Sequence, residues 1–260
     1  MLNYYWRLLA TLWGFISFSL GGLLISVTLF PWFYVVVRDP LQRKLRAQYV
    51  VYRIFGIFLS QLCFLGVMKL TVHQRDKLQN APGKLVIANH PCLLDVVSII
   101  SVLPRADCVV KSALWRHPFL AWVVRGASYI RNDNDAEKLL DRCVASIKQG
   151  NPLVIFPEGT RTRPGQPLKF QRGAANIAVR GDIDILPITV SCYPTTLTKA
   201  DKWYHIPSKP FHLQLWVGDV IQTQKIIADC EHNSTKSRRL TQYLLDYYTK
   251  EIESHERTRE

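Results

Sequence analysis

The feature that most constrains this chain is residues 8–37, a run of 30 positions without a charged side chain. A helix needs about 20 apolar residues to cross a bilayer, so the run is long enough to enter a membrane. A signal peptide fits poorly, because the apolar region is too long and no small-residue cleavage site follows it. Pro31 is expected to end or kink the helix. Three interpretations stay open: a buried core helix, a single membrane span, and a bent hairpin within one leaflet.

The charge of the chain points to an anionic partner. Lys and Arg outnumber Asp and Glu by 33 to 20, which gives a formal net charge of +13. The aromatic residues gather in apolar runs instead of alternating with Lys and Arg, which favours a membrane over a nucleic acid. Basic residues follow the long run at Arg38, Arg43, Lys44 and Arg46 and favour a cytoplasmic C-terminal flank. A shorter apolar stretch, residues 55–68, is expected to form an interfacial or core-covering helix.

The cysteines are scattered and show no Cys-x-x-Cys spacing. This pattern predicts free, buried thiols in a reducing compartment, with neither a disulfide framework nor a zinc site. The six positions are Cys63, Cys92, Cys108, Cys143, Cys192 and Cys230.

From about residue 70, short apolar strands alternate with helices. This alternation predicts an α/β fold, a mixed, mostly parallel sheet flanked by helices, which follows an N-terminal membrane-associated helical segment. Strands are expected at 84–88, 107–110, 152–156, 184–190 and 211–217. Helices are expected at 93–102, 117–125, 136–148, 173–180 and 236–254. The expected domains are 1–69, the apolar and basic helices; 70–235, the α/β domain; and 236–260, a C-terminal helix with a charged tail.

A histidine and an aspartate follow the first of these strands. His90 comes directly after Asn89, and Asp95 lies five residues further on. An aspartate bonded to one imidazole nitrogen fixes the tautomer and leaves the other nitrogen free to act as a general base. Asn89 is expected to have a structural role. Cys92 could be a nucleophile, but the two leucines after it favour a small buried residue.

A second polar loop follows the strand at 152–156. It combines backbone amides, a hydroxyl and a guanidinium, which together suit a phosphate group. The alternative is an ordinary turn with a solvated arginine. Lys111 and Arg131 follow other apolar runs and could join the site. The candidate anion-binding residues are Glu158, Gly159, Thr160, Arg161, Arg131 and Lys111.

These motifs resemble those of the glycerolipid acyltransferases, the family of the 1-acylglycerol-3-phosphate acyltransferases. The family's Asn-His-x4-Asp block is similar to residues 89–95, and its Phe-Pro-Glu-Gly-Thr-Arg block is complete at 156–161. A looser match lies at 126–131, and an apolar strand with a proline lies at 185–188. The resemblance covers roughly residues 70–220.

The resemblance implies a membrane-bound O-acyltransferase of phospholipid biosynthesis. Such an enzyme moves a fatty acyl group from acyl-CoA or acyl carrier protein to a lysophospholipid hydroxyl, most readily that of 1-acyl-sn-glycerol-3-phosphate, giving phosphatidic acid. It implies that His90 takes the hydroxyl proton, that Asp95 orients His90, and that the loop at 158–161 binds the phosphate. Its partners would be membrane lipid, the acceptor and the thioester co-substrate, with no metal, other cofactor or nucleic acid. The expected location is the bacterial inner membrane, with the catalytic domain facing the cytoplasm.

Other functions stay open. The acceptor could be another lysolipid, such as a lyso-ornithine lipid. A thioesterase or lipid hydrolase would need a nucleophile, and the chain has no Gly-x-Ser-x-Gly elbow. A non-catalytic membrane scaffold would predict the loss of His90, Asp95 or Glu158, and all three are present.

Overall fold

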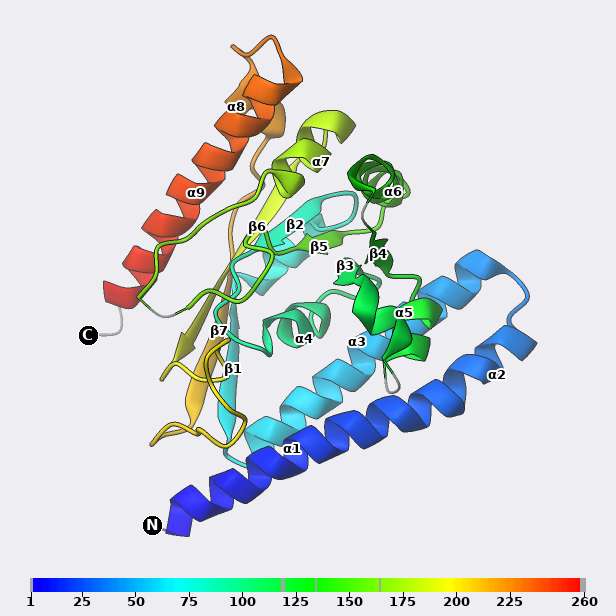
Figure 1. Ribbon diagram of the computed structural model, residues 1–260, viewed down its shortest axis with the longest axis vertical. Coiled ribbons are helices and arrows are strands. Elements are labelled where there is room, and N and C mark those ends of the chain that lie inside the picture. The colour runs from blue at the N-terminus through cyan, green and yellow to red at the C-terminus, as the bar shows by residue number, and fades with distance from the viewer. Residues whose placement is uncertain (1, 118–119, 134, 164, 258–260) are drawn as a thin grey trace.

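The protein is described by a computed structural model, which defines residues 2–117, 120–133, 135–163 and 165–257. Within these residues the chain forms a seven-stranded sheet with the order β1-β7-β6-β2-β5-β3-β4 (Figure 1). Only the β6–β7 pair is antiparallel, so the sheet is mixed and mostly parallel, as the sequence predicts. The strands are β1 Met68–His73, β2 Leu85–Ala88, β3 Asp107–Lys111, β4 Ile130–Asn132, β5 Leu153–Ile155, β6 Ile185–Tyr193 and β7 Phe211–Val217.

Helices cover both faces of the sheet. On one face lie α6 Ala136–Lys148, α7 Gly173–Gly181 and α9 Asn233–Arg257, with the short α8 Thr223–Ile227 beside them. On the other lie α1 Leu2–Val27, α2 Leu29–Val36, α3 Pro40–Phe64, α4 Asp95–Ile100 and α5 Ala121–Gly126 (Figure 1). Two 3₁₀ turns, η1 Arg75–Asn80 and η2 Ser112–Arg116, complete the described elements.

The central strand β2 explains why the fold has three layers. Its residues are fully buried, and Leu85 and Ile87 join the core under α7 and α9 while Val86 and Ala88 join the core under α3 and α4. Successive side chains of a strand point to opposite faces, so an unbroken apolar run needs cover on both sides. The N-terminal helices supply part of that cover.

The helix break in the N-terminal run lies just before Pro31. The first helix, α1, ends at Val27, and α2 starts at Leu29, so Pro31 stands in the first turn of α2. Proline is tolerated there because first-turn amides have no partner within the helix. Its missing N–H interrupts the hydrogen bond that a continuous helix would make to the carbonyl of Val27, so the break that the sequence predicts falls a few residues earlier.

The second apolar stretch differs from its prediction. Instead of a short helix at 55–68, the chain forms the 25-residue α3, which starts at Pro40 behind an Asp39 cap. Basic residues at 43–53 lower the mean hydropathy of the first half of this helix, so the sequence pattern did not indicate it. Met68 already belongs to β1, so the domain boundary expected at residue 70 falls inside a strand.

Most other elements lie where the sequence predicts them. The helix at 136–148 has the predicted bounds, and the side chain of Asp135 caps it by accepting from the amide of Lys138. The five predicted strands are present within a few residues, whereas β1 and β4 were not predicted. The prediction of a helix at 117–125 is met by the shorter α5, and its positions 118–119 lie outside the described residues.

Buried polar contacts join the N-terminal helices to the α/β domain. Near the start of α1, the guanidinium of Arg7 donates to the carbonyls of Pro207 and Ser208, both at 2.8 Å. Near the start of α3, the ammonium of Lys44 lies 2.7 Å from the fully buried carboxylate of Asp107. Beyond the end of α1, Phe30 is 1 % exposed and packs on Gly126 of α5. The N-terminal segment is therefore held against the domain near both of its ends.

Candidate active site

Two neighbouring strands deliver the polar loops to one edge of the sheet. Strands β2 and β5 pair in parallel, with Leu85 opposite Leu153. The carboxyl ends of parallel strands meet at the same edge, which is where sites form in sheets of this type. The loop with His90 therefore leaves the sheet beside the loop with Arg161.

The histidine and aspartate that the sequence pairs are in contact. The Nδ1 atom of His90 lies 2.9 Å from Oδ2 of Asp95, and the Asp95 side chain is fully buried at the start of α4. The same Oδ2 accepts from the amide of Cys92 at 2.7 Å. Burial raises the pKa of Asp95, and its hydrogen bond to His90 opposes this rise. With Nδ1 held by Asp95, Nε2 is the imidazole nitrogen left for proton transfer.

Two hydrogen bonds join the two loops through the backbone of His90. Its amide donates to Oε1 of Glu158 at 2.8 Å, and its carbonyl accepts from the amide of Thr162 at 2.9 Å. The ring of Phe156 lies 4.5 Å from the imidazole, centroid to centroid. The second loop thus fixes both the position of the His90 backbone and one side of its ring.

Glu158 faces inward, toward the His90 loop. Its side chain is buried, and burial raises its pKa to about 7. The buried Oε2 atom has no hydrogen-bond partner among the described residues. These contacts suit a residue that positions His90, and no contact of Glu158 in the structure suits a phosphate ligand.

The first loop is held by Asn89, in the structural role that the sequence predicts. The Asn89 side chain accepts from the amide of Val190 at 2.7 Å and donates to its carbonyl at 2.8 Å, which extends the β2–β6 ladder by one rung. Cys92 is completely buried, and the neighbouring Cys192 thiol together with burial raises its pKa well above the usual value. A thiol that stays protonated is a poor nucleophile.

Arg161, in the second loop, contacts the segment between β6 and β7. Its Nη1 donates to the carbonyls of Leu197 at 2.8 Å and Thr198 at 3.0 Å, so one edge of the guanidinium is held by the 194–210 loop. Thr160 is exposed beside it. Gly159 has a φ of +69°, and a Cβ there would lie 2.8 Å from Nε2 of Gln171. The positive φ favours glycine at this turn, whereas the end of the flexible Gln171 side chain could move away from a Cβ.

Arg131 and Lys111 lie further along the sheet. Strand β4 carries Arg131 and is separated from β2 by β5 and β3, a distance of about 14 Å at the usual strand spacing. The guanidinium of Arg131 pairs with Asp133 at 2.6 Å. Lys111 is exposed at the end of β3, opposite Asn132. The structure thus brings His90, Asp95 and residues 158–161 together and leaves these two cations at the periphery.

An apolar cavity of about 470 Å³ opens beside the histidine–aspartate motif. Leu93 and Leu94, between His90 and Asp95, form part of its wall, and residues of α1, α3 and α5 form another part. The 194–210 loop, α4 and β3 contribute to the wall as well. The cavity volume lies in the range of ligand pockets, roughly 300–1,000 Å³. Sequence reasoning missed this cavity because its lining comes from segments far apart in the chain. The available signal was in α1, where smaller or polar side chains at the spacing of one helix face line the cavity at Arg7, Thr11 and Gly14.

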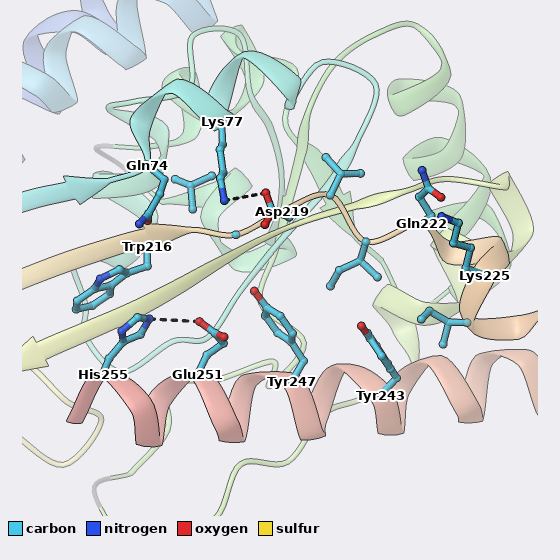
Figure 2. Close-up of a pocket in the computed structure, with 15 residues that line it drawn as sticks. Gln74, Lys77, Trp216, Asp219, Gln222, Lys225, Tyr243, Tyr247, Glu251 and His255 are labelled. Carbon is cyan, nitrogen blue, oxygen red and sulfur yellow. Dashed lines mark ion pairs between the residues drawn. The ribbon is translucent and has the colours of Figure 1, made fainter. Parts of the chain in front are cut away.

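A second cavity, of about 600 Å³, lies elsewhere (Figure 2). It is bounded by α9 and by the segment after β7, which meets β6 near the start of that strand, away from His90. Figure 2 shows Tyr247 and Glu251 pointing from α9 into it. Its polar side chains include the ion pair Lys77–Asp219 at 2.7 Å and the contact of His255 with Glu251 at 3.4 Å. Among the described residues, no group of three or more His, Cys, Asp or Glu could hold a metal ion.

The sequence of the chain is similar to those of known acyltransferases. Residues 69–191 match the family model described as Acyltransferase. The chain is 34 % identical over 158 residues to a putative 1-acyl-sn-glycerol-3-phosphate acyltransferase of Caenorhabditis elegans, covering 58 % of this chain and 55 % of that protein. It is 34 % identical over 134 residues to the 1-acyl-sn-glycerol-3-phosphate acyltransferase of Helicobacter pylori, covering 49 % and 56 %. Residues 69–191 thus carry an Acyltransferase domain, and the chain is similar to the glycerolipid acyltransferases.

The chain spans about half the length of the curated relatives that it matches. The fold is shared over a longer stretch. The crystal structure of the 1-acyl-sn-glycerophosphate acyltransferase PlsC from Thermotoga maritima matches 95 % of this chain and 98 % of that chain, with a TM-score of 0.67 and 18 % identity. This similarity includes the N-terminal helices as well as the α/β domain.

Proposed function

We propose that the chain is an O-acyltransferase that moves a fatty acyl group from a thioester to the hydroxyl of a lysophospholipid. The observation that carries the proposal is the His90–Asp95 pair, hydrogen-bonded through the His90 backbone to the loop that presents Arg161. The donor is acyl-CoA or acyl carrier protein. The acceptor is 1-acyl-sn-glycerol-3-phosphate, in line with the names of the relatives.

The proposed reaction needs no covalent intermediate on the protein. Nε2 of His90 takes the proton of the acceptor hydroxyl, and the hydroxyl oxygen bonds to the acyl carbon of the thioester. The carbon–sulfur bond then breaks, and the imidazolium returns the proton to the departing thiolate. Asp95 holds the imidazole and stabilises its charged form.

Arg161 is the proposed contact for the acceptor phosphate. One edge of its guanidinium is held by the carbonyls of Leu197 and Thr198, which orients the group without neutralising its charge. Thr160 is exposed beside it and can donate a further hydrogen bond. Glu158 acts by positioning His90. The apolar cavity beside Leu93 accommodates an acyl chain.

The proposed membrane contact is made by the N-terminal helices. By length and composition, the segments Asn3–Val36 and Pro40–Phe64 could cross a bilayer, and only 17 % of the apolar window of the first is buried. Because Arg7 and Phe30 hold both ends of that segment on the domain, we infer that it lies along the membrane within one leaflet. The cytoplasmic leaflet of a bacterial inner membrane is the proposed site, since thioester donors are cytosolic.

Product analysis tests this function. The purified chain in lipid vesicles is offered a panel of lysolipids, including lysophosphatidate and a lyso-ornithine lipid, with acyl-CoA and acyl carrier protein donors in separate reactions. Mass spectrometry is expected to find phosphatidate as the main product. Exclusive acylation of a lysolipid without phosphate would contradict the acceptor, and release of free fatty acid alone would indicate a hydrolase.

A further inference from the structure

The 194–210 loop connects β6 to β7. It is hydrogen-bonded both to α1 and to the loop that contains His90. Arg7 of α1 donates to the carbonyls of Pro207 and Ser208, and the amide of Leu93 donates to the carbonyl of Leu197 at 3.1 Å. Four of its residues, Thr196, Leu197, Ile206 and Pro207, line the apolar cavity. In Figure 1 the loop lies beside the N-terminal part of α1.

The outer side of this loop is aromatic and basic. Trp203 is 43 % exposed and Tyr204 is 40 % exposed. Three lysines, Lys199, Lys202 and Lys209, are exposed around them. The acidic residue of the loop, Asp201, accepts from the amide of Thr198 at 2.9 Å and is therefore turned to the backbone. Tryptophan and tyrosine concentrate at membrane interfaces, and clustered lysines attract anionic lipid headgroups.

This surface lies beside α1, in contact with Phe15, and a different side of α1 carries an exposed apolar stripe. The ring of Trp203 lies 6.5 Å from that of Phe15, centroid to centroid, in an edge-to-face arrangement. Side chains of α1 at helical spacing are exposed along its length: Tyr5, Leu9, Trp13, Ile16, Leu20 and Leu24. Exposed apolar surface of this extent indicates a membrane or a protein partner. The lysines of the adjacent loop and the absence of charge along residues 8–27 favour the membrane.

We propose that the 194–210 loop is a separate membrane-interface contact, in which Trp203 and Tyr204 enter the headgroup layer and the lysines bind anionic phospholipids. The proposal rests on the membrane placement of α1 proposed above, but not on acyl transfer. Binding of this loop to the membrane would also position Arg161. The same loop holds Arg161 and the amide of Leu93, so its docking sets the proposed phosphate contact at the height of the lipid headgroups.

A fluorescent probe tests the contact. An environment-sensitive fluorophore is attached through His205→Cys, which leaves both aromatic residues in place. The background is Cys63→Ser/Cys230→Ser, since the other four cysteines are buried. The matched control carries the probe at Glu231→Cys, an exposed position beside the start of α9. The full chain is reconstituted in vesicles of phosphatidylcholine and phosphatidylglycerol that contain a headgroup-labelled quencher lipid.

Quenching at position 205 is expected to exceed that at position 231 several-fold. Lys199→Glu/Lys202→Glu should lower the quenching at 205 toward the value in pure phosphatidylcholine. Lys148→Glu/Arg238→Glu, which changes the net charge equally at exposed sites elsewhere, should not. Equal quenching at the two probe positions would overturn the proposal, and so would equal effects of the two charge variants.

Acyl transfer by each variant in detergent micelles is measured in parallel. Retained activity shows that the loop variants are folded. If the unsubstituted chain transfers no acyl group while the probe at 205 is quenched, the enzymatic function fails and the membrane contact stands.

Discussion

At the scale of single residues, Glu158 differs most from its predicted role, because its side chain is buried against the backbone of His90. Burial raises the pKa of its carboxyl from 4.5 to about 7, and the hydrogen bond that the carboxyl accepts from the amide of His90 opposes this rise. A group whose pKa is raised by folding stabilises the folded state while it is protonated. That contribution is complete below pH 4.5 and is lost as the pH rises to about 7.

The first prediction follows from this linkage. Glu158→Gln keeps an oxygen acceptor for His90 and cannot ionise, so it should retain most activity. Its melting temperature relative to the unsubstituted chain should rise between about pH 5 and pH 8. Glu158→Ala leaves the His90 amide without its partner, at a cost of about 1–3 kcal/mol, and should lower kcat. Thermal melts and initial rates check this, and a pH-independent difference in melting temperature would contradict the assigned pKa.

The second prediction is that Arg161, and not Arg131, binds the phosphate of the acceptor. Arg161→Ala should raise the KM for lysophosphatidate by roughly 10- to 100-fold, because hydrogen bonds to charged groups contribute about 1.5–3 kcal/mol. The KM for the donor should change little. Arg131→Ala is the matched control, since Arg131 pairs with Asp133 away from His90. Equal effects of the two substitutions on the acceptor KM would show that the phosphate is bound elsewhere.

At the scale of elements, α3 is the link between the apolar segment and the sheet. The carboxylate of Asp107, at the start of β3, pairs with Lys44 of α3 and accepts from Gln48 at 2.5 Å, and Ser146 of α6 also donates to it. One buried acid thus joins two helices from opposite faces of the sheet. Removing one partner of a buried ion pair destabilises the folded state, even where the intact pair contributes little net stability.

The third prediction concerns this pair. Lys44→Met should lower the melting temperature in detergent by about 6–12 °C, the equivalent of roughly 3 kcal/mol for a chain of this size. Lys44→Met/Asp107→Asn should recover part of that loss, because the acid is no longer left without its cation. A double variant less stable than the single one would show that Asp107 is stabilised mainly by its neutral partners.

The elements also show what the sequence can predict. Strand β2 and the helix at 136–148 were predicted because burial on both faces and an acidic cap leave local patterns. The first half of α3 was missed because its basic residues, such as Lys44, find partners only in the folded chain.

The same limit applies to the site. The His90–Asp95 contact follows from spacing along the chain and was predicted. The inward turn of Glu158, the hold of Leu197 on Arg161 and the apolar cavity depend on tertiary packing, which no local pattern encodes.

At the scale of the whole molecule, the apolar N-terminal segment is part of the fold. Helix α1 contributes Phe15 and Phe18 to the cavity wall on one side and exposes an apolar stripe on the other. Apolar area of this kind holds a protein in lipid independently of salt, whereas attraction between surface charges is screened over about 8 Å at physiological ionic strength.

The fourth prediction is that the full chain stays with membranes through a high-salt wash and leaves them in detergent. Sedimentation of washed membranes and immunoblotting of both fractions check this. Release by high salt alone would show that the stripe on α1 does not enter lipid.

The central claim is that His90 takes the proton of the acceptor hydroxyl, and initial rates of phosphatidate formation test it most directly. The unsubstituted chain, His90→Ala and Cys92→Ala are compared in the same vesicles, with circular dichroism as a check on folding. His90→Ala should lower the rate by about 10²–10⁴-fold, the usual contribution of a general base. Cys92→Ala should retain most of the rate, because the buried Cys92 thiol stays protonated. An active His90→Ala variant beside an inactive Cys92→Ala variant would contradict the account.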